Sequence, residues 1–193
     1  MALITRSHTK GDAPSTAVYS PCEQYRYSLT RVWDSAAPRV MFVMLNPSTA
    51  TEVQNDPTVE RCERRARVLG FGGFRVTNIF AFRATDPRDM RAAPDPIGPD
   101  NDATLVEGAD WADRIIAAWG VHGAHLDRGL AVAARLIAAI DKALEELAQQ
   151  FESEIVELWD ALRANDHDHR LLAKVGLEQI RLGTASETKE YDH

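Results

Sequence analysis

Polar side chains suited to catalysis follow three apolar runs of this 193-residue chain. An amide and a carboxylate can position a water molecule, an arginine can bind a phosphate, and an indole can flank a flat ring. Asn46 and Asp56 are the candidate amide and carboxylate, and Arg83 is the candidate for a phosphate. The other candidates for substrate binding in these clusters are Pro47, Ser48, Thr49, Asn78 and Trp119.

Each candidate also has a structural interpretation, which the spacing leaves open. Asn46 precedes Pro47, a pair typical of turns, and Asp56 precedes Pro57, which is the pattern of a helix N-cap followed by proline. Trp119 is equally suited to packing. The residue types therefore indicate a site only if the fold brings the three clusters together.

The apolar runs before these clusters predict strands. Residues 40–45 are six consecutive apolar residues, which suits a strand buried on both faces, and the patterns over 74–82 and 114–119 predict two more. Helices are predicted between them, from 56 to 70 and near 102–108. This alternation predicts an α/β fold, a three-layer α/β/α sandwich with a central mainly parallel sheet, in which ligands bind beyond the carboxyl ends of the strands.

The two ends of the chain are predicted to differ from this centre. Residues 1–20 lack periodicity and predict a flexible lead-in, which leaves 21–193 as a single domain. An alternating segment over 24–33, followed by a turn and the next apolar run, indicates an N-terminal hairpin. Apolar residues three or four apart predict a long amphipathic helix over 130–164. Its stripe over 130–162 fits docking onto the sheet, or a coiled-coil homodimer because the spacing runs close to heptads.

Charge argues against a protein that binds polyanions over its whole surface. Lysine and arginine number 22 against 29 aspartates and glutamates, a net charge of −7. The stretch 60–91 is the exception, since eight arginines against four acids make it +4 and leave −11 for the remainder. Such a stretch fits a small anion or a short piece of nucleic acid, and it fits an ordinary solvated surface equally well.

The sequence lacks the features that usually identify several classes of protein. No apolar run approaches the ~18 residues of a membrane span, and residues 1–20 lack the hydrophobic centre of a signal peptide. We therefore predict a cytoplasmic protein without membrane contact, in which Cys22 and Cys62 are thiols. Common phosphate-loop, nucleophile-elbow and zinc-protease motifs are absent, and His167 and His169 lie in a polar connector. We predict no metal and no cofactor.

Six ordered motifs resemble one known family. They occur between about residues 19 and 128 and comprise 26–33, 44–50, 55–58, 77–85, 98–102 and 118–120. Motifs of this kind, in this order, are similar to those of the bacterial and phage domain-of-unknown-function family 1643. The name of that family implies no activity.

A more distant resemblance is to the uracil-DNA glycosylase superfamily. Leu-Asn-Pro at 45–47 is similar to the end of the first-strand motif of these enzymes, whose polar residue positions the attacking water. Thr-Asn at 77–78 with Arg83 is similar to their second-strand motif, and 115–120 is similar to their third core strand. The resemblance implies a parallel four-stranded sandwich and a terminal His-Pro motif. Residues 182–189 resemble the segment that precedes this motif, but no His-Pro follows them.

The resemblance implies a DNA glycosylase-like protein that hydrolyses the N-glycosidic bond of a modified or damaged base. Asn46 would position water, and Asp56 would orient it or act as the base. The flipped base would be framed by Asn78 and Trp119, and flanking phosphates would contact Arg61, Arg64 and Arg83. The expected partner is DNA or a nucleotide. Two alternatives stay open: a hydrolase or transferase that binds a free nucleotide or nucleoside, and a non-catalytic nucleic-acid or protein interaction module.

Overall fold

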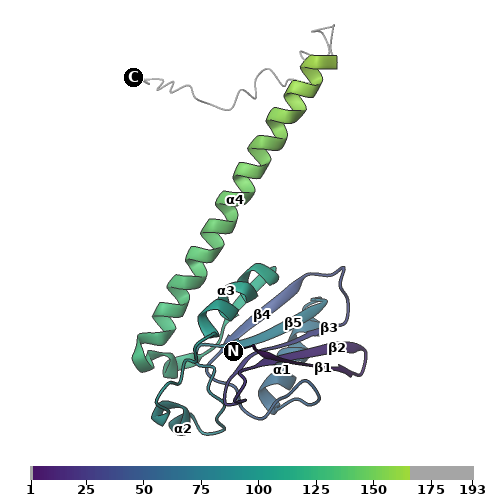
Figure 1. Ribbon diagram of the computed structural model, residues 1–193. Helices are drawn as coiled ribbons and strands as arrows, with labels where there is room; N and C mark the ends of the chain where they lie inside the picture. Colours follow the sequence, from purple (N-terminus) through teal and green to yellow (C-terminus); the bar gives the residue numbers. More distant parts are fainter. Residues whose placement is uncertain (1, 166–193) are drawn as a thin grey trace, which may run out of the picture. The chain divides into compact units, whose positions relative to one another are not determined.

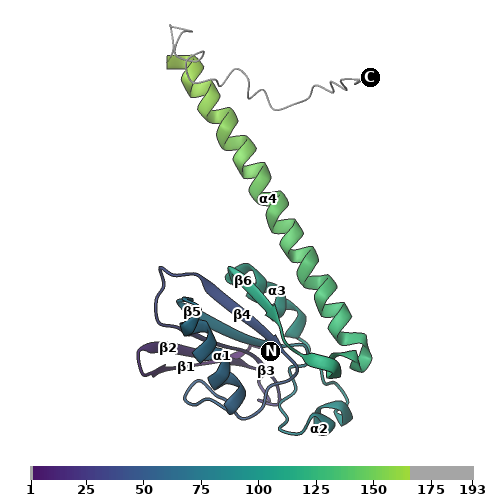
Figure 2. The ribbon, with the colours of Figure 1, turned by 180° about the vertical axis from the view of Figure 1, so that it is seen from behind.

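Six strands form one sheet, and helices lie on both of its faces (Figure 1, Figure 2). The computed structural model describes residues 2–165, with side chains described as far as Leu158. The strands are β1 (Ile4–Lys10), β2 (Ala13–Tyr19), β3 (Arg26–Val32), β4 (Arg39–Met44), β5 (Gly73–Asn78) and β6 (Arg114–Ala117). The helices are α1 (Pro57–Val68), α2 (Pro87–Ala92), α3 (Asn101–Trp111) and α4 (Arg128–Asn165), with the short 3₁₀ segment η1 (Gly120–Asp127) before α4.

The sheet is mixed, which corrects the prediction of a mainly parallel one. Its strand order is β1-β2-β3-β5-β4-β6, and β4 pairs in parallel with β5 and with β6. The other three pairings are antiparallel. The apolar run in β4 predicts the parallel part, because a strand buried on both faces requires helical crossovers to its neighbours. The pattern of one strand does not specify its partner, so the antiparallel part could not be predicted in the same way.

Residues 4–19, predicted as part of a flexible lead-in, form a hairpin. β1 and β2 pair along their whole length, and Gly11, with φ of +63°, supplies the left-handed conformation in the turn between them. Alternate residues of β2 are buried, but most of them are small, which conceals the alternation in the sequence. The predicted hairpin between 24–33 and the next apolar run is also wrong, because β5 lies between β3 and β4.

β4 divides the core into two clusters. Phe42 belongs to the cluster that includes the buried face of α1, whereas Met41 and Val43 belong to the cluster that includes Leu105 of α3. Figure 1 accordingly has α3 in front of the sheet, and Figure 2, from behind, has α1 in front. The second cluster also receives Val132 from the start of α4. These clusters confirm the prediction that residues 40–45 form a strand buried on both faces.

The predicted long helix is confirmed as α4. The chain divides into two units with a boundary between Leu144 and Glu145, and α4 crosses that boundary. Large apolar side chains remain exposed along it: Leu130, Ile137, Ile140, Leu144, Leu147, Phe151, Val156 and Leu158. None of the helices within residues 2–165 is long and apolar enough to cross a membrane. Residues 182–189, which resemble the segment before a His-Pro motif, lie outside the described residues, as do His167 and His169.

Candidate functional site

Residues from the ends of the three parallel strands meet at one cavity of about 180 Å³. We call it the inner cavity, and it is lined by Arg26, Met44, Leu45, Asn46, Ser48, Asp56, Thr58, Val59, Val76, Asn78 and Ala118. Four of these residues, Asn46, Ser48, Asp56 and Asn78, were singled out as candidates from the sequence. The fold therefore brings together polar side chains that lie up to 32 positions apart in the chain.

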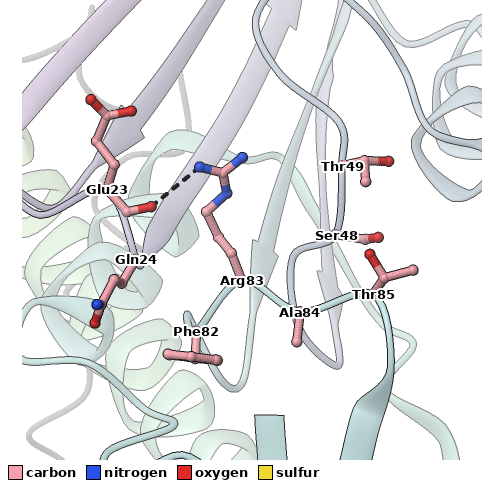
Figure 3. A pocket seen from close by; sticks show the side chains of 8 residues that line it. All are labelled: Glu23, Gln24, Ser48, Thr49, Phe82, Arg83, Ala84 and Thr85. Carbon is pink, nitrogen blue, oxygen red and sulfur yellow. Dashed lines mark hydrogen bonds between the residues drawn. The ribbon is translucent and has the colours of Figure 1, made fainter. Parts of the chain in front are cut away.

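A second, larger hollow of about 490 Å³ lies beside it and shares Ser48 as a wall. This outer groove is lined by Glu23, Gln24, Ser48, Thr49, Phe82, Arg83, Ala84 and Thr85 (Figure 3). Arg83 lies between the 23–24 segment and the 48–49 segment, and its Nη1 donates a hydrogen bond to the backbone carbonyl of Glu23 at 3.2 Å. Its Nε is buried and donates to none of the described residues. The groove therefore combines a cation with hydroxyl groups.

The loops after β4 and β5 are fastened to each other by backbone hydrogen bonds. The amide of Ala84 donates to the carbonyl of Pro47 at 2.9 Å. Asn46 Nδ2 donates to the carbonyls of Ala84 at 2.8 Å and Pro47 at 3.1 Å. Both acceptors are carbonyl oxygens, so they fix which end of the Asn46 amide is the nitrogen. Asn46 Oδ1 is therefore left as an acceptor that can orient a water molecule.

Asp56 caps helix α1, as its position before Pro57 predicts. Its Oδ1 accepts hydrogen bonds from the amides of Thr58 at 2.9 Å and Val59 at 2.8 Å. Its Oδ2 accepts none from the residues that the structure describes. The two interpretations of Asp56 are thus compatible, since one oxygen serves the helix and the carboxylate also lines the inner cavity.

A buried ion network holds the loop that delivers Asp56. Arg31 donates to the carbonyl of Thr51 at 3.1 Å and lies 3.4 Å from Glu63, which also accepts from Asn55 at 2.8 Å. Burial opposes ionisation of Glu63, but the Asn55 hydrogen bond and the charges of Lys10 and Arg31 together outweigh it and lower the pKa of that carboxyl. The 51–56 loop is therefore anchored by charged groups in the core.

Arg26 is the residue of the inner cavity that the sequence analysis missed. Only 1% of it is exposed, and its Nη1 donates to the carbonyl of Ala50. Its Nε is buried without an acceptor, and none of the carboxylates described within residues 2–158 forms an ion pair with it. Burial lowers the pKa of Arg26 to about 10, so the guanidinium remains charged at neutral pH. Its place at the start of the 26–33 motif was the signal that could have identified it.

Asn78 lines the same cavity and carries a second buried donor. It is 1% exposed, and its Nδ2 has no acceptor within the described part of the chain. Its backbone carbonyl accepts from Asn101 Nδ2 at 3.0 Å, which ties the end of β5 to the first residue of α3. Asn78 is therefore held in place while its side-chain donor is left without a partner among the described residues.

The remaining candidates lie elsewhere. Trp119 lines neither hollow and packs instead against η1 and the start of α4, where a Cβ on Gly123 would lie 2.2 Å from the indole. Arg61 and Arg64 are exposed on α1 and also line neither hollow. Pro47 is buried and contributes its carbonyl. No group of three or more metal-binding side chains occurs within residues 2–165.

Comparison with known proteins identifies one family. The family model described as "Protein of unknown function (DUF1643)" matches residues 26–154. No curated protein and no solved structure matches the chain. The matched range includes every residue that lines the inner cavity.

Proposed function

We propose a function from the premise that this chain belongs to the DUF1643 family, whose model covers about two thirds of it, and that its chemistry resides in the inner cavity. The proposed reaction is hydrolysis of the N-glycosidic bond of a modified or damaged base. The observation that carries the proposal is that Asn46, Asp56, Arg26 and Asn78 line one cavity. Arg26 and Asn78 each carry a buried donor without a partner among the described residues.

The sizes of the two hollows support a division of the substrate. Sites for drug-sized ligands usually occupy about 300–1,000 Å³, so the inner cavity of about 180 Å³ suits a single flat ring. The outer groove of about 490 Å³ suits the sugar and phosphate, with Arg83 as the cation. Ser48 lines both hollows and so marks the position of the bond between base and sugar.

Within this arrangement, Asn46 holds the attacking water and Asp56 takes its proton. Asn46 Oδ1 accepts a hydrogen bond from the water, because Nδ2 is committed to backbone carbonyls. The Asp56 carboxylate accepts the proton as the water oxygen bonds to the sugar carbon. In DNA the base must first leave its stack, which costs a few kcal/mol and favours weakened pairs or single strands.

The proposal is tested by incubating the protein with oligonucleotides that carry normal, deaminated or hypermodified bases. Mild alkali then cleaves any abasic site. We expect strand cleavage with the wild type and its loss with Asn46→Ala, whereas the matched control Gln149→Ala, an exposed amide on α4, should retain it. Unchanged cleavage by Asn46→Ala would contradict the proposed mechanism, and no cleavage of any oligonucleotide would contradict the reaction.

A second candidate is the same bond in a free nucleotide or nucleoside. It is favoured by the net charge of −7 and by the distribution of the arginines, since Arg61 and Arg64 line neither hollow. Binding of DNA should weaken steeply between low and moderate salt because phosphate contacts release counterions. A site for one nucleotide should respond much less, so a salt titration of binding separates the two candidates.

We also propose that α4 pairs with α4 of a second copy of the chain. Its exposed residues Leu130, Ile137, Leu144, Phe151 and Leu158 follow one another at intervals of seven. A repeat of seven keeps an apolar seam on one side of a helix, which is what a coiled-coil partner of the same period covers. An identical helix satisfies that period, and two-fold dimers are the commonest assemblies of this kind.

A further inference from the structure

Two residues that line the inner cavity, Arg26 and Asn78, each carry a buried donor that lacks an acceptor, and one of these residues is charged. Arg26 and Asn78 are each 1% exposed, and Arg26 Nε and Asn78 Nδ2 are both buried without a partner among the described residues. A buried charge without a counter-ion destabilises the folded protein, so it persists only where something offsets it or uses it. An arginine of this kind contrasts with an ordinary buried arginine, which has a carboxylate partner.

Arg31 provides that comparison within the same strand. It is as deeply buried as Arg26, but it contacts the Glu63 carboxylate at 3.4 Å, Ser15 Oγ at 3.2 Å and the carbonyl of Thr51 at 3.1 Å. Arg26 has the carbonyl of Ala50 as its hydrogen-bond acceptor and no ion pair in the described chain. The strand thus holds one arginine with a structural ion pair and one arginine that faces a cavity.

The nearest acid that faces the same cavity is Asp56. It favours the charged form of Arg26 through space but makes no hydrogen bond to it, and its Oδ1 accepts instead from the amides of Thr58 and Val59. The charges of Arg31 and Arg83 act in the opposite direction. The local field of the inner cavity is therefore that of a cation with an incomplete counter-charge, which suits a ligand that brings a negative charge.

We propose that Arg26 stabilises the negative charge of the departing base, with Asn78 Nδ2 as a second donor to the same planar oxyanion. This inference rests on the proposed function. When the N-glycosidic bond breaks, its electron pair passes to the ring nitrogen of the base and spreads onto the carbonyl oxygens attached to the ring. The sugar carbon gains the oxygen of water, and the water proton passes to Asp56. Donors aimed at the developing anion accelerate such a step.

The same arrangement selects among bases. An exocyclic amino group would bring its own N–H donors against Arg26 and Asn78, and buried donors that face each other lose their hydrogen bonds. An exocyclic carbonyl oxygen supplies the acceptor that both side chains lack. The cavity is therefore expected to prefer bases whose leaving form is an oxygen-rich anion.

The test measures thermal unfolding of the full chain with three probes. Barbiturate is a planar ring anion, thymine is a neutral ring of similar size, and inorganic phosphate is an anion without a ring. We expect barbiturate to raise Tm and thymine to have little effect, because only the first brings the missing charge. A rise with phosphate but not with barbiturate would overturn the inference and assign Arg26 to a substrate phosphate.

Substitution of the arginines makes the test specific. Arg26→Met should abolish the barbiturate effect and leave the unliganded Tm unchanged or higher, since it removes an unpaired buried charge. The matched control Arg31→Met should lower the unliganded Tm by roughly 10 °C because it leaves the Glu63 carboxylate without its buried partner. A barbiturate effect that persists at full size in Arg26→Met would overturn the inference.

Two further measurements keep the inference separate from the proposed reaction. If Arg26→Met does not fold, Asn78→Leu should reduce barbiturate affinity at least tenfold, and undiminished affinity would count against the subsite. Base release at an unchanged rate in a folded Arg26→Met protein would refute the leaving-group role and leave the hydrolase proposal standing. Barbiturate binding that depends on Arg26, with no base release from any oligonucleotide, would support the anion subsite and refute the reaction.

Discussion

Replacing Glu63 by glutamine should destabilise the protein far more than its chemical similarity suggests. Glu63 is 7% exposed and contacts three cations, Arg31 at 3.4 Å, Lys10 at 3.3 Å and Arg67 at 3.2 Å. Arg31 has no exposed surface, so it cannot turn to water when the carboxylate is lost. Breaking a buried ion pair by removing one partner costs about 3–5 kcal/mol.

We expect Glu63→Gln to lie near the lower end of that range, at about 3 kcal/mol, because Arg31 keeps its bonds to Ser15 and Thr51. For a folded unit of this size, each kcal/mol lowers Tm by about 2–4 °C. The expected fall is therefore roughly 6–12 °C, measured by circular dichroism during heating and by urea unfolding.

The matched control for this prediction is Glu107→Gln. Glu107 pairs with Arg75 at 3.1 Å, but its side chain is 71% exposed, so the free energy of unfolding should change by about 0–1 kcal/mol. Equal changes in Tm for the two variants would refute the argument from burial.

The dependence of stability on pH provides a second check. Because the folded protein lowers the pKa of Glu63, its contribution is present above the ordinary glutamate value of 4.5 and is lost as pH falls through the folded value. Wild type and Glu63→Gln should therefore converge in stability in acid.

Three further predictions follow from the described geometry. At mildly alkaline pH a thiol reagent should label Cys22 quickly and Cys62 only on unfolding, because Cys22 is exposed with its pKa lowered by the Ser20 hydroxyl, whereas burial raises the pKa of Cys62 to about 11; rapid labelling of both would contradict this. Gly123→Ala should destabilise the protein by about 1–3 kcal/mol, since the added methyl would overlap the Trp119 ring; an unchanged urea midpoint would show that the ring can move aside. Leu144→Asp, on the exposed stripe of α4, should convert a dimer to a monomer by light scattering, and a monomeric wild type would refute pairing through α4.

The parts of the fold that local pattern determines were predicted. The uninterrupted apolar run of β4 identifies a strand buried on both faces, and the Asp56-Pro57 pair identifies the start of α1. The hairpin of β1 and β2 was not predicted, because its buried residues are mostly alanine and serine, which carry little hydrophobic signal. Strand order was not predictable for a different reason. The insertion of β5 between β3 and β4 depends on how whole elements pack, so no local sequence pattern indicates it.

The same distinction applies to the site. The ends of β4 and β5 were correctly expected to deliver Asn46 and Asn78 to one edge of the sheet. Arg26 was missed because a search for residues after parallel strands overlooks a strand that runs the other way. Trp119 was expected beside the ligand, but η1 turns the chain immediately after β6, with left-handed residues at Leu126 and Asp127, and the indole packs inside that turn.

The reversed direction of β3 also divides the inner cavity between two pieces of chain. Because β3 is antiparallel to β5, its first residue and not its last reaches the ligand edge, so Arg26 arrives with the N-terminal three strands. Asn46, Asp56 and Asn78 all belong to the chain after the exposed turn at 34–36. A protein cut at that turn would carry Arg26 on one fragment and Asn46, Asp56 and Asn78 on the other. Neither fragment would have a complete inner cavity. If the proposed base release returned when the two fragments were mixed, it would indicate that the sheet had reassembled.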